Sequence, residues 1–289
     1  MPLRETEAVV LRSYRLGEAD KIVSLFTRQF GRLRAVAAGA QRPKGRYGAT
    51  LEPLSYVRLW IFERENRDLL RLNSAELLES FFDMQRQYRV QIAAQYVAEV
   101  SERLLPEREL NERVFRLLLT VLRGMKRSSE LERPLLYFNY WLLRLAGFLP
   151  DLEQCAGCGR PLGEEAAYYG NGAEGLLCAE CGRGNNVQAT YSRDLSGEPG
   201  ISSASSASLE GQQVSRDRVD DAQHAVSART RALGRTCRSI SLDRWFQEVA
   251  PQPGVPQARL FFERLVEIHA ERKLVTRGIL DEALSESGT

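Results

Sequence analysis

The fold of the N-terminal part is decided by the stretch EAVVLRSYRLGEADKIVSLFTRQFGRLRAVAAGAQRPKGRYGATLEPLSYVRLWIF, residues 7–62. Short apolar runs recur in it, namely AVVL, KIVSLFT, RLRAVAA and YVRLWIF, and a fifth run, LLRL, follows at 69–72. Gly, Pro and Asn residues separate the runs at short intervals, which is typical of strands joined by tight turns. The pattern therefore predicts a small β-barrel that ends at about Glu79.

The hydrophobic period becomes helical after Phe81. Apolar residues then recur at spacings of three and four, which places them on one face of a helix: Val90, Ala93, Val97, Val100 and Leu104. One helix is expected to end near Pro106, a second to begin at Asn111 as its N-cap, and a third to span 131–148. A later amphipathic helix is predicted over 256–274. We expect these helices to form a core.

A polar stretch interrupts the helical part at about 185–236. It contains GEPGISSASSASLEGQQ (197–213), whose Ser, Gly and Gln residues offer little apolar surface to offset the entropy of ordering. We expect a flexible insertion here. The sequence thus predicts an α+β protein with a barrel domain at 1–80 and a helical domain at 81–289.

The composition is that of an ordinary globular chain. The 289 residues are 43% hydrophobic and 27% charged, which argues against collagen-like, mucin-like and wholly disordered classes. No stretch approaches the ~20 consecutive apolar residues of a membrane span, and the charged start lacks the apolar segment of a signal peptide. We therefore expect a cytoplasmic protein. Because 40 basic and 38 acidic residues leave a net charge of only +2, a nucleic-acid surface would need local segregation of charge.

Four cysteines form the strongest local motif, Cys155-Ala-Gly-Cys158 and, after 19 residues, Cys178-Ala-Glu-Cys181. Two C-x-x-C knuckles can direct four thiolates to one tetrahedral zinc ion, and the glycines at 157, 159 and 182 suit the tight turns of knuckles. Four cysteine ligands leave no open coordination position, so the motif predicts one structural zinc ion per chain. The alternatives are two redox dithiols or cysteines that only pack. Cys237 lies outside the motif and is expected to be an isolated thiol.

Sequence motifs for catalysis are weak. His269-Ala-Glu271 matches the H-x-E half of a zinc-deaminase signature, but it follows both knuckles, whereas in that signature it precedes a P-C-x-x-C motif. The other histidine is His224, within the polar stretch. No G-x-x-x-x-G-K-[ST] motif occurs, so an ATPase-type phosphate loop is not expected. We predict that the chain is not an enzyme and uses no nucleotide.

A run of positive charge lies within the predicted barrel. Residues 21–50 contain seven basic residues and no Asp or Glu, and we expect the basic residues to contact DNA: Lys21, Arg28, Arg32, Arg34, Arg42, Lys44 and Arg46. Five-stranded barrels of the OB type bind single strands through basic loops and through aromatic side chains that stack on bases. Tyr47, Tyr56 and Trp60 are the stacking candidates, with Phe62 nearby. The alternatives are a solvated basic loop and aromatic residues that fill the barrel.

Several short motifs occur in a fixed order within residues 7–62. They are G-E-x-D-K-I, L-F-T, F-G-x-L-R, G-A-x-R-P-K and L-E-P-L. Their order closely resembles the N-terminal domain of the RecO family of bacterial recombination mediators. The helical middle and the paired C-x-x-C motif agree in position, so the resemblance extends to about residue 182.

The resemblance implies an OB-fold barrel, a helical domain with a zinc-binding insertion at 155–181, binding to single- and double-stranded DNA, and annealing of complementary strands. It also implies RecR, the acidic C-terminal tail of the single-stranded-DNA-binding protein and, indirectly, RecA as partners at the nucleoid. For the tail we expect an apolar groove ringed by arginines on the helices, with the candidates Arg113, Arg116, Arg123 and Arg133. Outside the family, the alternatives are a protein-interaction scaffold with an incidental basic patch and a zinc ribbon that reads a DNA sequence.

Overall fold

A computed structural model describes residues 3–42, 45–62, 69–127, 130–170, 174–183, 224–248, 253–270 and 273–285. The contacts group the chain into two units, Met1–Leu149 with Arg235–Thr289, and Pro150–Gly234. The predicted flexible stretch 185–236 lies mostly outside the described residues. Its last part contradicts the prediction, because a strand, β7 (His224–Val226), and a helix, α5 (Ala228–Ser239), form there.

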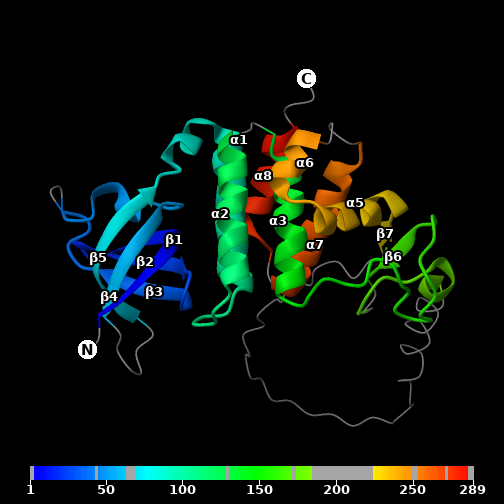
Figure 1. Ribbon diagram of the computed structural model, residues 1–289, viewed down its shortest axis with the longest axis horizontal. Coiled ribbons are helices and arrows are strands. Elements are labelled where there is room, and N and C mark those ends of the chain that lie inside the picture. Colours follow the sequence, from blue (N-terminus) through cyan, green and yellow to red (C-terminus); the bar gives the residue numbers. More distant parts are fainter. Residues whose placement is uncertain are drawn as a thin grey trace, which may run out of the picture. The chain divides into compact units, whose positions relative to one another are not determined.

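Five strands form a closed barrel in the N-terminal part, drawn in blue to cyan in Figure 1. The strands are β1 (Leu3–Leu16), β2 (Asp20–Thr27), β3 (Gly31–Ala37), β4 (Tyr56–Phe62) and β5 (Leu69–Glu79). They are joined in the order β1-β2-β3-β5-β4, and every described pair is antiparallel except β3 with β5. The small β-barrel expected from the five apolar runs is confirmed, and its five closed strands agree with the OB-type barrel that the family resemblance implies.

Alternation along each strand determines which side chains fill the barrel. In β3, Leu33 and Ala35 are buried, while Arg32 and Arg34 lie on the opposite side of the strand. Tyr47, just before the short 3-10 helix η1 (Gly48–Leu51), also belongs to the barrel core. The other inward-facing residues are mostly aliphatic, among them Ala8, Val10, Val23, Leu25, Leu59 and Leu72.

Helices follow the barrel in the predicted order. Unit Met1–Leu149 with Arg235–Thr289 contains η2 (Phe82–Arg86), α1 (Tyr88–Leu104), α2 (Glu112–Arg127), α3 (Glu132–Leu145), α6 (Leu242–Glu248), α7 (Val255–Ala270) and α8 (Val275–Ser285). Helix α2 packs on α3, α3 on α7, and α1 on α8. Among the described residues, none of the helices combines the length and the apolarity needed to cross a membrane.

Two helix ends have clear local causes. The side chain of Asn111 accepts a hydrogen bond from the Val114 amide at 3.1 Å, so the predicted N-cap of α2 is confirmed. Helix α3 ends earlier than the predicted residue 148. Gly147 adopts a φ of +79°, and the Phe148 amide donates back to the Leu143 carbonyl, which stops the helix.

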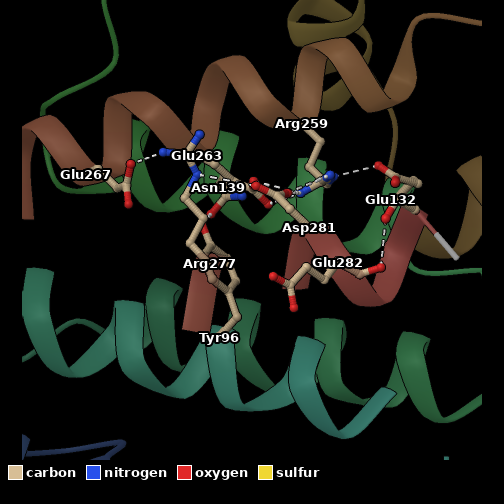
Figure 2. A network of polar contacts seen from close by, with 10 residues as sticks. Tyr96, Glu132, Asn139, Arg259, Glu263, Glu267, Arg277, Asp281 and Glu282 are labelled. Atoms are coloured by element: carbon tan, nitrogen blue, oxygen red, sulfur yellow. Dashed lines mark hydrogen bonds and ion pairs between the residues drawn. The ribbon is translucent and has the colours of Figure 1, made fainter. Parts of the chain in front are cut away.

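A buried ionic network joins α3, α7 and α8 (Figure 2). The Arg259 guanidinium donates to both carboxylate oxygens of Glu263 and to Glu132, each at 2.7 Å. Figure 2 shows the same guanidinium reaching Asp281 of α8, at 3.2 Å. Arg259 is 4% exposed and Glu263 is fully buried. Because a buried charge is costly unless it is paired, this network fixes how α7 and α8 pack on the core.

His269, the first residue of the H-x-E segment, packs against another aromatic ring near the end of α7. The ring of His269 stacks on Phe148 with centroids 4.4 Å apart, and burial lowers the pKa of His269. Glu271 lies outside the described residues. The packing of His269 therefore agrees with the expectation that this segment belongs to an amphipathic helix.

Candidate nucleic-acid interface and metal centre

Four cysteine side chains meet in the unit Pro150–Gly234. The Sγ atoms of Cys155, Cys158, Cys178 and Cys181 all lie within 4.8 Å of one another, and those of Cys158 and Cys178 are 3.9 Å apart. Zinc–sulfur bonds of about 2.3 Å in a tetrahedron place the sulfurs about 3.8 Å apart. The cluster therefore has the donors and the spacing to bind a metal ion.

Tight backbone turns bring the two knuckles together. Gly159 adopts a φ of +71°, which closes the turn after Cys158. Gly157 approaches the second knuckle so closely that a Cβ at this position would lie 3.1 Å from the Cys181 Sγ. Gly159 thus allows the chain to turn, whereas Gly157 allows the first knuckle to approach Cys181 of the second.

An ion pair spans the two knuckles. Arg160 donates its Nε to the Cys158 Sγ at 3.4 Å and pairs with Glu180, which lies between Cys178 and Cys181 in the sequence. The hydrogen bond from Arg160 lowers the pKa of Cys158 to about 6. The thiolate, which is the form that binds metal, is therefore favoured at this position near neutral pH.

Arg231 holds the chain segment that follows the first knuckle. Its side chain, only 1% exposed, donates to the carbonyls of Leu162, Gly163 and Glu165 at 2.9, 2.6 and 2.7 Å. The sequence analysis missed this residue, because it lies far along the chain from the carbonyls and within the stretch expected to be flexible.

Four of the seven cations of residues 21–50, Lys21, Arg28, Arg32 and Arg34, form ion pairs with acids from outside the run. Glu107 pairs with both Arg32 and Arg34 at 3.1 Å. Arg28 pairs with Glu112 at 2.8 Å and with Glu7 of β1 at 3.1 Å. The charge run has no acid within it, but the fold brings acids to it from a distant segment.

The remaining basic residues of the run differ in their surroundings. Lys21 pairs with Glu52 at 3.2 Å. Arg42 and Arg46 are exposed, and neither forms an ion pair within the described part of the chain. Lys44 lies outside the described residues. Arg42 and Arg46 are thus the described members of the run that most closely match the predicted free cations.

The three stacking candidates differ in exposure. Tyr47 is 2% exposed and donates its hydroxyl to the Leu72 carbonyl at 3.0 Å, so it fills the barrel and cannot stack on a base, contrary to the prediction. Tyr56 is half-buried, and its hydroxyl donates to Glu7 at 2.8 Å. Trp60 is also half-buried on β4. Only Tyr56 and Trp60 therefore keep surface for a ligand.

A groove of about 390 Å³ lies between α2 and α3. Its lining is mostly apolar and includes two of the predicted arginines: Arg113, Arg116, Leu117, Thr120, Tyr137, Trp141 and Leu145. No acidic residue is among these lining residues. The groove thus combines an apolar wall with positive charge.

The other two predicted groove arginines have structural partners instead. Arg123 pairs with Glu79 at 2.8 Å. Arg133 is buried, pairs with Glu130 at 3.0 Å and donates to the Trp245 carbonyl. Neither lines the groove, so the prediction that all four arginines ring it is wrong for these two.

The sequence matches two family profiles, Recombination protein O N terminal over residues 1–81 and Recombination protein O C terminal over residues 85–197. It is 35% identical to the DNA repair protein RecO of Koribacter versatilis over 280 residues, which is 97% of this chain and 99% of that protein. The chain belongs to the RecO family. The DNA repair proteins RecO of Thermoanaerobacter sp. (strain X514) and Symbiobacterium thermophilum are 34% and 36% identical over 63% of this chain and 72% of their own lengths.

Membership in the RecO family places this chain among DNA repair and recombination proteins, and it confirms the resemblance drawn from the N-terminal motifs. The similarity to the Koribacter protein continues past residue 197, where the second profile match ends. The helices α5 to α8 are therefore part of what this chain shares with another RecO protein.

Two further arginines of this RecO chain lie beside the candidate sites. Arg46 lies 5.0 Å from the ring centroid of Tyr47, whose hydroxyl donates to the carbonyl of Leu72, the residue after Arg71 on β5. The exposed Arg71 therefore adds positive charge near Arg46. The Arg144 guanidinium lies 5.7 Å from the ring centroid of Trp141 at the groove. No local motif marks either residue, because each gains its role from the fold.

Proposed function

We propose that this RecO protein is a recombination mediator of the cytoplasm and nucleoid. It binds single- and double-stranded DNA, anneals complementary strands and, with RecR, helps to load RecA onto DNA coated by the single-stranded-DNA-binding protein. The observation that carries the proposal is a closed five-strand barrel with exposed cations in a chain of the RecO family. Such barrels bind single strands through basic loops and stacking side chains.

The main DNA contacts in this proposal are the exposed cations around Arg46. Arg42 and Arg46 are exposed without an ion pair in the described ranges, and Arg71 adds a third exposed cation. Lys44 joins them on sequence grounds. Guanidinium groups bind phosphate oxygens through charge-assisted hydrogen bonds, which position a strand without reading its sequence. On β4, the strand that pairs with β5, Trp60 is the residue proposed to stack on a DNA base.

Reversing charge at Arg42 and Arg46 together is expected to weaken oligonucleotide binding by similar factors for unrelated sequences. Each lost phosphate contact on a single strand removes about 0.7 from the magnitude of the slope of log affinity against log salt, so the slope should fall by about 1.4. Affinity is measured against salt for Arg42→Glu/Arg46→Glu and for Arg113→Glu/Arg116→Glu, which changes the net charge equally. Equal losses in the two variants, a marked sequence preference, or no salt-sensitive binding by the wild type would contradict the proposal.

Strand annealing is expected to fall in parallel with affinity and to proceed at the same rate with and without ATP. A cationic surface allows two polyanions to approach by neutralising both backbones, and no bond needs to be hydrolysed for this. The rate is followed with labelled complementary oligonucleotides for the wild type and the Arg42→Glu/Arg46→Glu variant. Annealing that requires ATP would overturn this mechanism.

The groove between α2 and α3 is the proposed site for the tail of the single-stranded-DNA-binding protein. An acidic peptide with an apolar end would place its carboxylates at Arg113 and Arg116 and its apolar end against Leu117 and Trp141. The α2 and α3 walls are mostly apolar, and Arg144 stands beside Trp141. The positive charge of the arginines and the apolar walls of the groove therefore favour an acidic peptide with an apolar end over a neutral peptide.

Arg113→Glu/Arg116→Glu is expected to weaken binding of a labelled acidic tail peptide by about tenfold or more. Charge-assisted hydrogen bonds contribute about 1.5–3 kcal/mol each, and 1.4 kcal/mol corresponds to a factor of ten. The titration is done by fluorescence anisotropy at low salt, with Arg42→Glu/Arg46→Glu as the matched variant. No saturable binding by the wild type, or the same loss in both variants, would contradict the groove as the site.

We also propose that the four-cysteine cluster holds one structural zinc ion. The chemistry supplied by the ion is coordination alone, since four thiolates leave no position for substrate or water. Cys155, Cys158, Cys178 and Cys181 would hold it, and Arg160 would offset part of the negative charge of four thiolates.

A further inference from the structure

The outer face of β2 and β3 is covered by the chain itself. Phe26 on β2 is fully buried, and its ring centroid lies 6.3 Å from that of Phe115 on α2. The Arg108 amide donates to the Arg32 carbonyl at 2.9 Å, and a side chain at Gly31 would collide with the backbone of Glu109. Because OB-type barrels bind oligonucleotides on this face, residues 105–112 occupy a surface that a nucleic acid could otherwise use.

The covering segment supplies carboxylates to the arginines of that face. Glu107 lies 3.1 Å from Arg34, and Glu112 lies 2.8 Å from Arg28. The hydrogen bond from Arg28 lowers the pKa of Glu112, so this carboxylate is ionised at neutral pH. A carboxylate and a phosphate accept the same forked hydrogen bonds from a guanidinium. These acids therefore occupy the arginines as a DNA backbone would.

The arginines of this face differ in how firmly they are held. The side chains of Arg28 and Arg34 are 45% and 44% exposed, so water can compete for their ion pairs, and such exposed pairs contribute little to stability. Arg32 is 16% exposed and also donates to the Leu105 carbonyl at 2.9 Å, which fixes it in place. Arg28 and Arg34 can thus exchange a carboxylate for a phosphate, whereas Arg32 is a structural link.

We infer that Glu107 and Glu112 are intramolecular competitors of phosphate at Arg34 and Arg28, and that they weaken DNA binding and reduce its salt dependence. The competition does not require the covering segment to open, because the carboxylates and the two arginines all reach solvent. This inference rests on the proposed DNA binding by the barrel. It makes the acidic segment a determinant of affinity in addition to the free cations around Arg46.

The test compares two glutamine variants that remove the same charge. Glu107→Gln/Glu112→Gln removes the carboxylate partner of Arg34 and one of the two partners of Arg28, which keeps its contact with Glu7 at 3.1 Å. Glu18→Gln/Glu109→Gln removes two exposed carboxylates that form no ion pair in the described part of the chain, and Glu109 lies in the same segment. Affinity of the full-length protein for a fluorescein-labelled oligothymidine is measured from low to high salt. Thermal unfolding checks that both variants remain folded.

Glu107→Gln/Glu112→Gln is expected to bind the oligonucleotide about threefold to tenfold more tightly at low salt. Its salt slope should be steeper by about 0.7 to 1.4, because Arg34 gains a phosphate contact and Arg28 gains a second one where phosphate also displaces Glu7. The Glu18→Gln/Glu109→Gln variant should keep the wild-type slope. Adding Arg28→Ala and Arg34→Ala to the first variant should abolish the gain, which identifies those two arginines as the freed contacts.

Equal changes in the two glutamine variants would overturn the inference, since a general loss of negative charge would then explain the gain. An unchanged slope in Glu107→Gln/Glu112→Gln would also overturn it while leaving the proposed function intact. A wild-type protein that binds no DNA at any salt would instead refute the proposed function, and the inference with it.

Discussion

Replacing Cys178 by serine is expected to remove the bound metal and unfold the unit Pro150–Gly234. Structural zinc contributes an apparent free energy of about 10–16 kcal/mol in small domains, and that energy is part of folding. The described part of the unit has few buried apolar residues with which to replace it: Leu152, Ala167, Leu176, Leu177 and Val226 are among them. The measurements are zinc content of the purified full-length protein and proteolytic sensitivity of this unit. Intrinsic DNA affinity should change much less than stability.

Cys237→Ala is the matched control for this prediction. Cys237 is buried in α5, outside the cluster, and burial strongly raises the pKa of its thiol. This variant should keep one zinc ion per chain and the wild-type pattern of proteolysis. A wild-type protein with almost no metal, four reduced thiols in the cluster and an intact fold would refute the zinc proposal.

Arg259→Met is expected to lower the free energy of unfolding by about 3–5 kcal/mol. The substitution removes the partner of Glu263, which is fully buried, and it also leaves Glu132 without its 2.7 Å contact. The resulting loss comes mainly from a buried carboxylate that has no cation beside it. Urea unfolding followed by circular dichroism measures the change, with Arg58→Met as control. Arg58 has more exposed partners, so its loss should cost about 1 kcal/mol or less.

The difference in free energy of unfolding between the wild type and the Arg259→Met variant should become smaller as the pH falls. Burial raises the pKa of Glu263 to about 7, and Arg259 opposes that shift, so removing Arg259 raises the pKa further. A carboxyl whose pKa is higher in the folded state than its unfolded value of about 4.3 favours folding progressively as the pH falls between the two values. The gap to the wild type is therefore largest near pH 8 and smaller near pH 5. A gap that stays constant over this range would show that Glu263 does not carry the effect.

Local sequence patterns were sufficient for the barrel strands, for the helices α1 to α3 and α7, and for the cysteine cluster. The five apolar runs predicted the five strands, because alternation and turn residues are properties of neighbours in the chain. Asn111 was recognisable as an N-cap for the same reason. Two C-x-x-C motifs predicted the convergence of four sulfurs, since the geometry of each knuckle is local. The order of the N-terminal motifs also led to the family.

The tertiary structure decided which charges are free. Arg28 and Glu112 are 84 residues apart in the sequence, so the run of cations looked unpaired until the fold placed acids beside it. Tyr47 and Arg133 were surface candidates by residue type, but packing buried both. Pairing and burial depend on distant segments that meet only in the folded chain. For this protein, the sequence by itself therefore determined the barrel strands, the helices α1 to α3 and α7, and the cysteine knuckles, whereas β7, α5 and the available binding surface were decided by the tertiary structure.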